Sequence, residues 1–238
     1  MDSHFRKLRR RHDISAAEEA AIRDCVSEFR RVGPDETVIK AGQPLQESTL
    51  LLDGWLARVK DLRSGARQFT EIHVAGDFAD LHSFTLKRLD HEVVSLTQCH
   101  LAIFPHKRLR ELTERYPHLA RVYWFQTNLD AAIHREWTVC MARRSALARV
   151  SHLLCELSIR LQVTGLTDGT SFDFPLTQNE LADCLGLTTV HVNRTIQELR
   201  KRELIALDRR HVTLRDMDAL RNIAEFDESY LYLEKQPR

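Results

Sequence analysis

The chain has 238 residues, of which 43 % are hydrophobic and 29 % are charged, and its formal net charge is +1. These values are typical of a soluble globular protein with one large or two modest domains, and no apolar run reaches the roughly 18 residues that a membrane-spanning helix needs. The five cysteines are scattered without a CxxC pair; this indicates reduced thiols rather than disulfides or a zinc site, so we expect a cytoplasmic protein with no membrane partner and no bound metal.

The N-terminal segment, residues 1–32, is predicted to be helical. A basic run, Arg6–Arg11, leads into an acidic, alanine-rich stretch rather than into the apolar core of a signal peptide. Ser15 and Glu18 have the spacing of a capping box, which predicts that a helix over residues 14–32 begins there. Its apolar stripe consists of Ile22, Val26 and Phe29.

Short β-prone runs occupy the chain from about residue 36 to residue 104. Glycines separate these runs at intervals of about 11 residues, a spacing typical of sandwiches and barrels: Gly42, Gly54, Gly65 and Gly76. We therefore predict an α+β protein in which residues 33–116 form a double-sheet roll, a double-stranded β-helix. A short helix near residues 106–115 would end this domain.

A long helix is predicted to begin at Pro117 and to end near Met141, within a dimerisation segment of residues 117–143. About 24 residues at 1.5 Å each would make a rod of roughly 36 Å, which is long for a small domain to bury alone. Such a helix usually pairs with a copy of itself as a coiled coil, although packing against its own domain stays open. The expected dimer seam steps along one side in threes and fours: Leu119, Val122, Gln126, Leu129, Ile133, Glu136 and Cys140.

Residues 144–225 contain two short helices broken by a glycine, the pattern of a helix-turn-helix. Thr177 and Glu180 form a capping box at the first helix. Gly186 supplies the turn, and Thr188 caps the second helix. An ordinary helical hairpin is the alternative interpretation. After the second helix, residues 204–207 and 211–214 predict a β-hairpin, which would form a wing.

The second helix has the composition of a surface that reads DNA. Its apolar residues Val192, Ile196 and Leu199 share one face, which leaves polar side chains on the other, as base edges require. A local excess of arginine and lysine follows, the pattern of a phosphate-binding patch. We therefore predict binding of double-stranded DNA through Thr177, Thr188, Thr189, Val190, His191, Asn193, Arg194, Gln197, Lys201, Arg209 and Arg210. For Thr177 a capping role alone is an equal alternative, and the two wing arginines could be ordinary surface charges.

The order of these parts, a roll, a long helix and a winged helix-turn-helix, resembles the Crp/Fnr family of bacterial transcription regulators. Gly76-Asp77-Phe78 in the roll and Leu187–Arg194 in the second helix carry the resemblance, which covers residues from about 30 to 220. It implies a homodimer on a palindromic operator, with RNA polymerase as a further partner. The roll would be a cyclic-nucleotide-binding-like sensor domain.

The residues of the expected effector pocket depart from the family pattern for cyclic AMP. The candidate pocket residues are Phe78, Asp80, His82, Glu92 and Val94. Members that bind cyclic AMP place a Glu shortly after Gly-Asp-Phe, where Asp80 could stand in, and an Arg-Ser or Arg-Thr pair further on. Here that pair is replaced by a stretch without arginine, in which Glu92 would repel a phosphate. Cyclic AMP is therefore not expected.

Two other effectors known in the family are also not expected. An iron–sulfur cluster needs a run of N-terminal cysteines, and only Cys25 lies there. Haem would need axial ligands, for which His73, His82, His91 and Cys99 are conceivable. In a chain with twelve histidines such residues are more often surface or core groups. The effector is thus unknown, or there is none.

In the second helix the resemblance bears on sequence preference. Arg194 matches an arginine that both branches of the family share, and an arginine here can bond bidentately to guanine O6 and N7. Val190 replaces a glutamate and could contact a thymine methyl instead. We expect a half-site that keeps a guanine opposite Arg194 and otherwise differs from both known consensus sites.

Two other classes of function are weaker alternatives. A cupin-like metal-dependent enzyme would need a His-x-His pair, but Ala75 occupies the second place after His73. No nucleophile elbow, P-loop or HExxH motif occurs, so we do not expect an enzyme. A ligand-binding module without DNA activity would leave the second helix unexplained. The C-terminal tail, residues 226–238, could pack back on the roll or on a partner.

Overall fold

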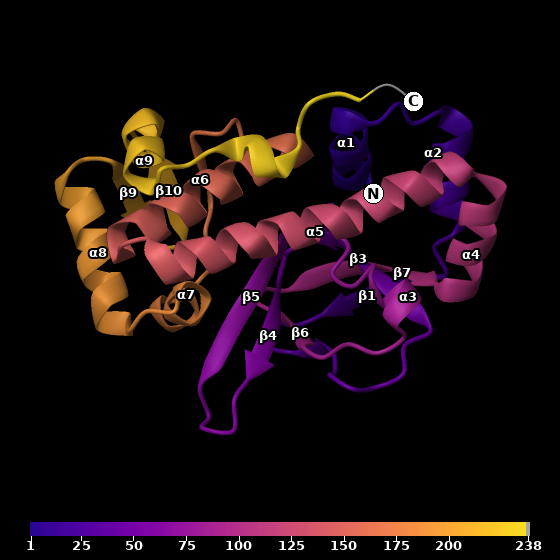
Figure 1. The fold of residues 1–238 in the computed structure, drawn as a ribbon, viewed down its shortest axis with the longest axis horizontal. Helices are drawn as coiled ribbons and strands as arrows, with labels where there is room; N and C mark the ends of the chain where they lie inside the picture. Colours follow the sequence, from indigo (N-terminus) through magenta and orange to yellow (C-terminus); the bar gives the residue numbers. More distant parts are fainter. Residues whose placement is uncertain (237–238) are drawn as a thin grey trace.

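The computed structural model describes residues 1–236 and contains a β-roll, a long helix and a winged helical domain (Figure 1). The roll consists of two antiparallel sheets with strand orders β1-β7-β3 and β2-β6-β4-β5. Its strands are β1 (Glu28–Val32), β2 (Thr37–Ile39), β3 (Glu47–Asp53), β4 (Trp55–Asp61), β5 (Arg67–Val74), β6 (Glu92–Ser95) and β7 (Cys99–Pro105). The predicted double-sheet roll is therefore confirmed.

The turn between β3 and β4 explains one of the regularly spaced glycines. Gly54 has φ +92°, and a Cβ added there would come within 2.4 Å of the carbonyl oxygen of Gln98. Only glycine combines this conformation with so close an approach. The turn brings β3 back as β4 in the opposite sheet of the roll.

The N-terminal segment differs from the prediction of one helix over residues 14–32. The structure has two helices, α1 (Asp2–Arg11) and α2 (Ala16–Asp24), and α2 begins with the expected Ser15–Glu18 capping box. Beyond Asp24 the chain becomes strand β1, in which Phe29 pairs with Ala102 of β7. The periodic stripe was therefore a wrong guide past residue 24, because pairing with β7 satisfies the backbone there instead of a further helical turn.

Helix α3 (Ser83–Leu86) lies in the chain between β5 and β6. Helices α4 (His106–Arg115) and α5 (Pro117–Arg143) follow β7, the last strand of the roll. The bounds of α4 and α5 agree with the prediction. With 27 residues, α5 is about 40 Å long at 1.5 Å per residue. It runs along both the roll and the C-terminal domain (Figure 1).

The predicted dimer seam on α5 is wrong, because those side chains are turned into their own protomer. Six of the seven are buried: Leu119, Val122, Gln126, Leu129, Ile133 and Cys140. The seventh, Glu136, pairs with Arg144 at 2.7 Å. The apolar periodicity was real, but the roll and the C-terminal domain cover it. The alternative of a helix packed on its own domain describes this face.

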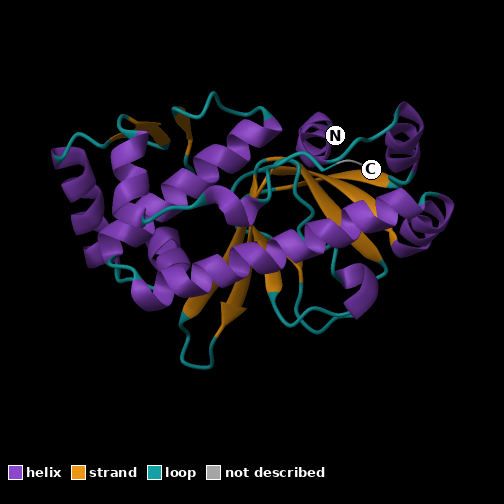
Figure 2. Cartoon of the chain, turned by 45° about the horizontal axis from the view of Figure 1, so that its top comes forward, coloured by secondary structure: helices purple, strands orange, loops and turns teal. Residues whose placement is uncertain are grey.

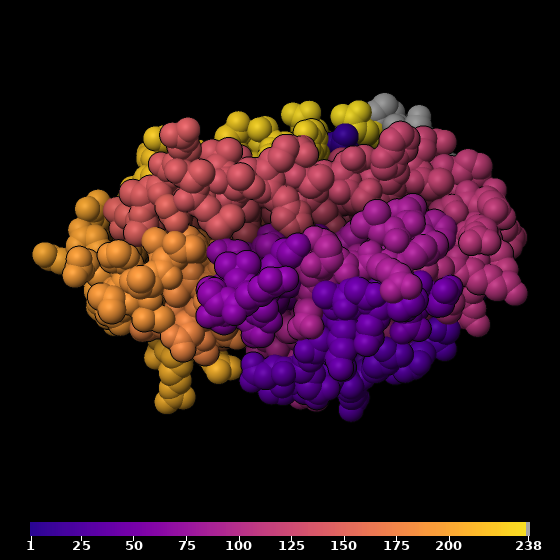
Figure 3. Space-filling model, turned by 60° about the horizontal axis from the view of Figure 1, so that its bottom comes forward, coloured from indigo at the N-terminus to yellow at the C-terminus, as the bar shows by residue number. Residues whose placement is uncertain are grey.

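The C-terminal domain holds the predicted helix-turn-helix and wing. Its helices are α6 (Ala146–Thr164), α7 (Gln178–Leu185), α8 (Thr189–Lys201) and α9 (Met217–Ala224), and its sheet, of order β8-β10-β9, consists of β8 (Ser171–Asp173), β9 (Ile205–Asp208) and β10 (His211–Leu214). Helices pack around one another and against this small sheet (Figure 2). In the space-filling view the segment of α7 lies beside the roll (Figure 3), where Gln68 of β5 donates to the carbonyl oxygen of Cys184 at 3.3 Å.

The C-terminal tail returns along α5 towards α1, after a short 3₁₀ helix, η1 (Glu228–Leu231). Arg11 donates to the carbonyl oxygen of Tyr232 at 2.9 Å, and the ring of Tyr232 lies edge-on to Phe125 of α5. The two ends of the described chain are therefore joined. The last two residues of the predicted tail, 237 and 238, lie outside the described residues. Among residues 1–236 no helix is long and apolar enough to cross a membrane.

Candidate nucleic-acid interface

The first helix of the helix-turn-helix, α7, is held at both ends. The Thr177 hydroxyl accepts from the Glu180 amide at 3.2 Å, and the Glu180 carboxylate accepts from the Thr177 amide at 2.6 Å. Gly186 ends the helix with φ +61°, a left-handed conformation that glycine adopts most easily. Arg149 of α6 donates to the carbonyl oxygen of Leu185 at 2.9 Å. The predicted capping box and turn are confirmed, and the Thr177 hydroxyl is engaged as a cap.

The second helix, α8, has the two faces that its sequence predicted. Val192, Ile196 and Leu199 are buried, and the Thr188 hydroxyl caps the helix by accepting from the His191 amide at 3.3 Å. The opposite face is exposed and carries Thr189, Val190, His191, Asn193, Arg194 and Gln197. At its start Val190 is 65 % exposed, so an apolar side chain stands in solvent among the polar ones.

The basic residues expected to meet phosphate are also exposed. Lys201 ends α8, and Arg209 and Arg210 form the turn of the wing between β9 and β10. The two wing arginines border an open groove of about 700 Å³ between the wing and the roll, with Asp53 and Asp173 among its other lining residues. The two arginines therefore share this groove with carboxylates and are also exposed to solvent.

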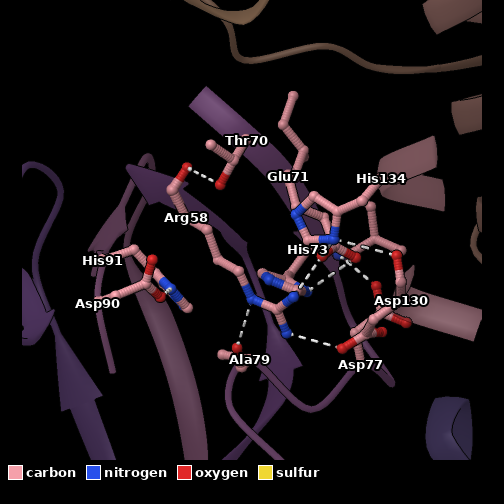
Figure 4. Close-up of polar contacts among 12 residues, drawn as sticks. Arg58, Thr70, Glu71, His73, Asp77, Ala79, Asp90, His91, Asp130 and His134 are labelled. Carbon is pink, nitrogen blue, oxygen red and sulfur yellow. Dashed lines mark hydrogen bonds and ion pairs between the residues drawn. The ribbon is translucent and has the colours of Figure 1, made fainter. Parts of the chain in front are cut away.

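Inside the roll, Arg58 of β4 lies at the centre of a buried ion cluster (Figure 4). Its guanidinium, 2 % exposed, donates to the Ala79 carbonyl oxygen at 2.9 Å, to Glu71 at 2.5 Å and to Asp130 of α5 at 2.8 Å. Burial by itself lowers the pKa of Arg58, but the Glu71 and Asp130 carboxylates outweigh it and raise that pKa. A charged link thus joins the roll to the long helix.

Two of the predicted effector-pocket residues are engaged in the core of the roll. The Asp80 carboxylate accepts from the Thr49 amide at 2.6 Å and from the Ser83 hydroxyl at 2.9 Å, and burial raises its pKa to about 7. The Phe78 ring packs edge-on against the rings of Phe104 and Tyr123. Both side chains are buried in these contacts.

The other three predicted pocket residues lie on the β6 side of the roll. Val94 is buried in β6, and Glu92, at the start of the strand, is only partly covered. The ring of His82 lies 5.4 Å from the ring of His91, and burial lowers the pKa of His82 to about 3. The pocket predicted from the sequence is therefore divided between core contacts and a partly open edge.

The remaining conceivable haem ligands are buried as well. His73 is buried, and neither ring nitrogen has a hydrogen-bond partner among residues 1–236. Burial lowers the pKa of His73 well below its usual value, so the ring is neutral. The Cys99 thiol donates to the Trp55 carbonyl oxygen at 3.3 Å. Across the described part of the chain, no three histidine, cysteine, aspartate or glutamate side chains are grouped so that they could hold a metal ion.

Sequence reasoning missed a second ion cluster, which joins the roll to the C-terminal domain. The Asp77 carboxylate accepts from Lys7 of α1 at 2.6 Å and from Arg160 of α6 at 2.8 Å. Arg160 also donates to Glu156 at 3.0 Å and to the Ile72 carbonyl oxygen at 2.7 Å. Burial alone would raise the pKa of Asp77, but Lys7 and Arg160 hold it well below its usual value. No local pattern pairs residues 83 positions apart, so the sequence held no signal for this contact.

Comparisons with known proteins agree with this architecture. Residues 29–116 match the model of the cyclic nucleotide-binding domain, and residues 148–223 match that of the Crp-like helix-turn-helix domain. The transcriptional activator protein FnrL of Cereibacter sphaeroides is 28 % identical over 210 residues, which cover 86 % of this chain and 83 % of FnrL. A probable transcriptional activator of Rhizobium leguminosarum bv. viciae is 30 % identical over 194 residues, which cover 80 % of this chain and 79 % of that protein.

Among solved structures, FixK2 from Bradyrhizobium japonicum superposes with a TM-score of 0.76. The sequence identity is 21 %, and the superposition covers 83 % of this chain and 97 % of FixK2. At this identity the likeness shows a common fold. The sequence relatives are transcriptional regulators rather than enzymes, so the cupin-like alternative is not favoured.

Proposed function

This chain belongs to the Crp/Fnr family of DNA-binding transcriptional regulators, and on this premise we propose that it acts as a cytoplasmic homodimer on a palindromic operator. The observation that carries the proposal is the exposed face of α8, which presents threonine, asparagine, arginine and glutamine side chains on a buried apolar support. Such side chains supply the donors and acceptors that base edges in the major groove require. RNA polymerase is the further partner that a regulator of this family implies.

Within this proposal the side chains of α8 divide between base reading and phosphate binding. Arg194 donates two hydrogen bonds to a guanine, and Val190 contacts a thymine methyl. Thr189, Asn193 and Gln197 line the same exposed face. The phosphate contacts come from the ends of the elements: Thr177, Thr188, His191, Lys201, Arg209 and Arg210. Of these, Thr177 acts through the backbone amides at the start of α7, because its hydroxyl is the cap.

The dimer surface that we propose is the solvent face of α5. Trp124 is 71 % exposed and Val139 is 48 % exposed, and Asn128, Ala131 and Arg135 lie exposed between them at helical spacing. An exposed row on a long helix that includes large apolar side chains is a candidate interface. The proposal requires that two α5 helices packed on this face bring both copies of α8 to one side of the dimer, because two half-sites lie about 34 Å apart.

The dimer surface is tested by Trp124→Asp, with Trp137→Phe as a control inside the protomer. Sedimentation equilibrium is expected to show a dimer for the unchanged protein and for the control, and a monomer at the same concentration for Trp124→Asp. A dimer that persists in Trp124→Asp would exclude this face of α5.

We also propose that specific DNA binding needs no cyclic nucleotide. The Asp80 carboxylate is already engaged by Thr49 and Ser83, and the Arg58 guanidinium is engaged by Ala79, Glu71 and Asp130. A cyclic phosphate entering the roll would have to displace a carboxylate from that guanidinium. The ion pair of Arg58 with Asp130 already joins β4 to α5.

The experiment for the proposed function is selection of random duplex DNA by the purified protein, without added ligand and at a stated moderate salt concentration. We expect enrichment of a palindrome with a guanine in each half-site. Salt-dependent binding without enrichment would contradict independence from an effector, and titration with cyclic AMP would then show whether a nucleotide restores selection. Absence of binding under all of these conditions would contradict DNA recognition itself.

A further inference from the structure

A hydrogen bond connects the two helices of the helix-turn-helix on their exposed side. The Asn193 side-chain amide donates to the Gln178 side-chain oxygen at 3.3 Å. Gln178 is the first residue of α7, and Asn193 is the fifth residue of α8. Both side chains are exposed, so the bond lies at the edge of the surface that α8 offers to DNA.

The backbone at both ends of this bond is well held. The capping box of Thr177 and Glu180 encloses the first turn of α7, where Gln178 sits. Asn193 follows Val192, which is fully buried and anchors this turn of α8. Because neither helix end is loose, the separation of the two side chains is set by the packing of α7 against α8. The bond therefore restrains side-chain rotation and not the helices.

The chemistry of an asparagine side chain makes this restraint relevant to base reading. An asparagine amide has two N–H donors and one carbonyl oxygen. Adenine in the major groove is read by one donor, which meets N7, and one acceptor, which meets the N6 amino group. The bond to Gln178 needs only one of the two N–H groups of Asn193. It leaves the pair of groups that adenine requires, and it opposes the half-turn of the amide that would exchange oxygen and nitrogen.

We infer that Gln178 is a positioning residue for specificity: it orients the Asn193 amide so that Asn193 reads an adenine in each half-site. Gln178 itself need not contact a base. This inference rests on the proposed function, because it names one further base of the operator and the residue that sets its recognition. It predicts that a change on α7 alters the preference for a base that α8 contacts.

The test measures binding of the full-length protein to the selected palindrome and to three duplexes with the other base pairs at one position of each half-site. That position is defined as the one where Asn193→Ala loses discrimination. We expect Asn193→Ala to reduce the preference for adenine by about fivefold to a hundredfold, as the loss of a bidentate base contact does. Gln178→Met, which keeps the length but not the acceptor, is expected to reduce it by about three- to tenfold at the same position, the worth of one ordinary hydrogen bond.

The double variant and a neighbouring control make the assignment specific. If Gln178 acts through Asn193, the double variant discriminates no worse than Asn193→Ala alone. Asn179→Ala, an exposed polar change one residue further along α7, is expected to leave discrimination unchanged. Circular dichroism of each variant checks that the helices are retained.

Three results would overturn the inference. An equal loss by Gln178→Met on all four duplexes would show that Gln178 meets phosphate. Additive losses in the double variant would show that the two residues act independently. Retained discrimination at every position in Asn193→Ala would show that Asn193 reads no base. A protein that selects no palindrome at all would instead contradict the proposed function, so the two failures are distinct.

Discussion

The exposed face of α8 holds its polar side chains in water, whereas the cluster of Lys7, Asp77, Glu156 and Arg160 holds its charges between α1, the roll and α6. On α8 the side chains have few partners within the chain, so they cost little to expose and remain available to DNA. In the cluster the charges are desolvated and satisfy one another. In the proposed function the exposed side chains of α8 serve recognition, whereas the buried charges of the cluster join α6 to the roll.

The largest effect is expected from removing the centre of the buried cluster. Arg160→Met leaves Asp77 and Glu156 buried without their shared cation, and loss of one partner of a buried ion pair typically costs about 3–5 kcal/mol. Urea denaturation measures the free energy of unfolding. The control is Arg202→Ala, which removes an exposed pair with Glu198 that is worth about 0.3–0.5 kcal/mol. An equal loss in the free energy of unfolding in the two variants would contradict a larger contribution from the buried charges than from the exposed ones.

A pH effect of similar size is expected from His4, which is buried against the roll and contacts the Gly76 carbonyl oxygen at 2.9 Å. Burial lowers the pKa of His4 to about 4 from 6.5. The folded state therefore favours the neutral ring, so this contribution is complete above pH 6.5 and is lost as the pH falls towards 4. The loss is about 3 kcal/mol, since each tenfold change in proton affinity corresponds to about 1.4 kcal/mol.

The variant His4→Gln isolates this contribution. Other buried groups titrate in the same range, and burial raises the pKa of Asp80 to about 7, which acts in the opposite direction. The difference between the two unfolding profiles from pH 7 to pH 4 removes these common terms. Parallel profiles would show that the pKa of His4 is the same in the folded and in the unfolded protein.

On the exposed side, Arg194→Ala is expected to weaken binding to the selected palindrome by about 1–3 kcal/mol and to change binding to random DNA little. Lys201→Ala is the comparison, because a phosphate contact weakens binding to every sequence and lowers the salt dependence by about one ion. Fluorescence anisotropy at several salt concentrations measures both. An equal loss of affinity for both DNAs in Arg194→Ala would show that Arg194 contacts phosphate only.

The smallest effect is expected at the cap of α7. Thr177→Ala removes the hydroxyl that accepts from the Glu180 amide and is expected to cost about 1 kcal/mol. Thr177→Ser retains the hydroxyl and is expected to be nearly neutral. Thermal unfolding of the two variants checks this order. A loss in DNA affinity without a loss in stability would assign Thr177 to phosphate binding as well.

Features that depend on residues close together in the chain could be predicted. The capping boxes at Ser15 and Thr177, the turn at Gly186 and the two faces of α8 follow from spacings of a few residues, and the structure contains all of them. The turn glycines likewise indicated a roll. For these features the interacting groups lie within one or two helical turns or one hairpin, so side-chain periodicity and capping chemistry are sufficient.

Contacts between distant segments could not be predicted in the same way. The apolar stripe through Phe29 predicted a helix, but this segment pairs with β7 as a strand. The apolar side of α5 faces its own protomer rather than a partner. The periodicity of a sequence shows that one face of a helix is apolar. It does not show whether that face packs against the same chain or against a partner. Asp77 and Arg160 lie 83 residues apart, and their pairing, which places α6 against the roll, exists only because the folded chain brings two desolvated charges to the same point.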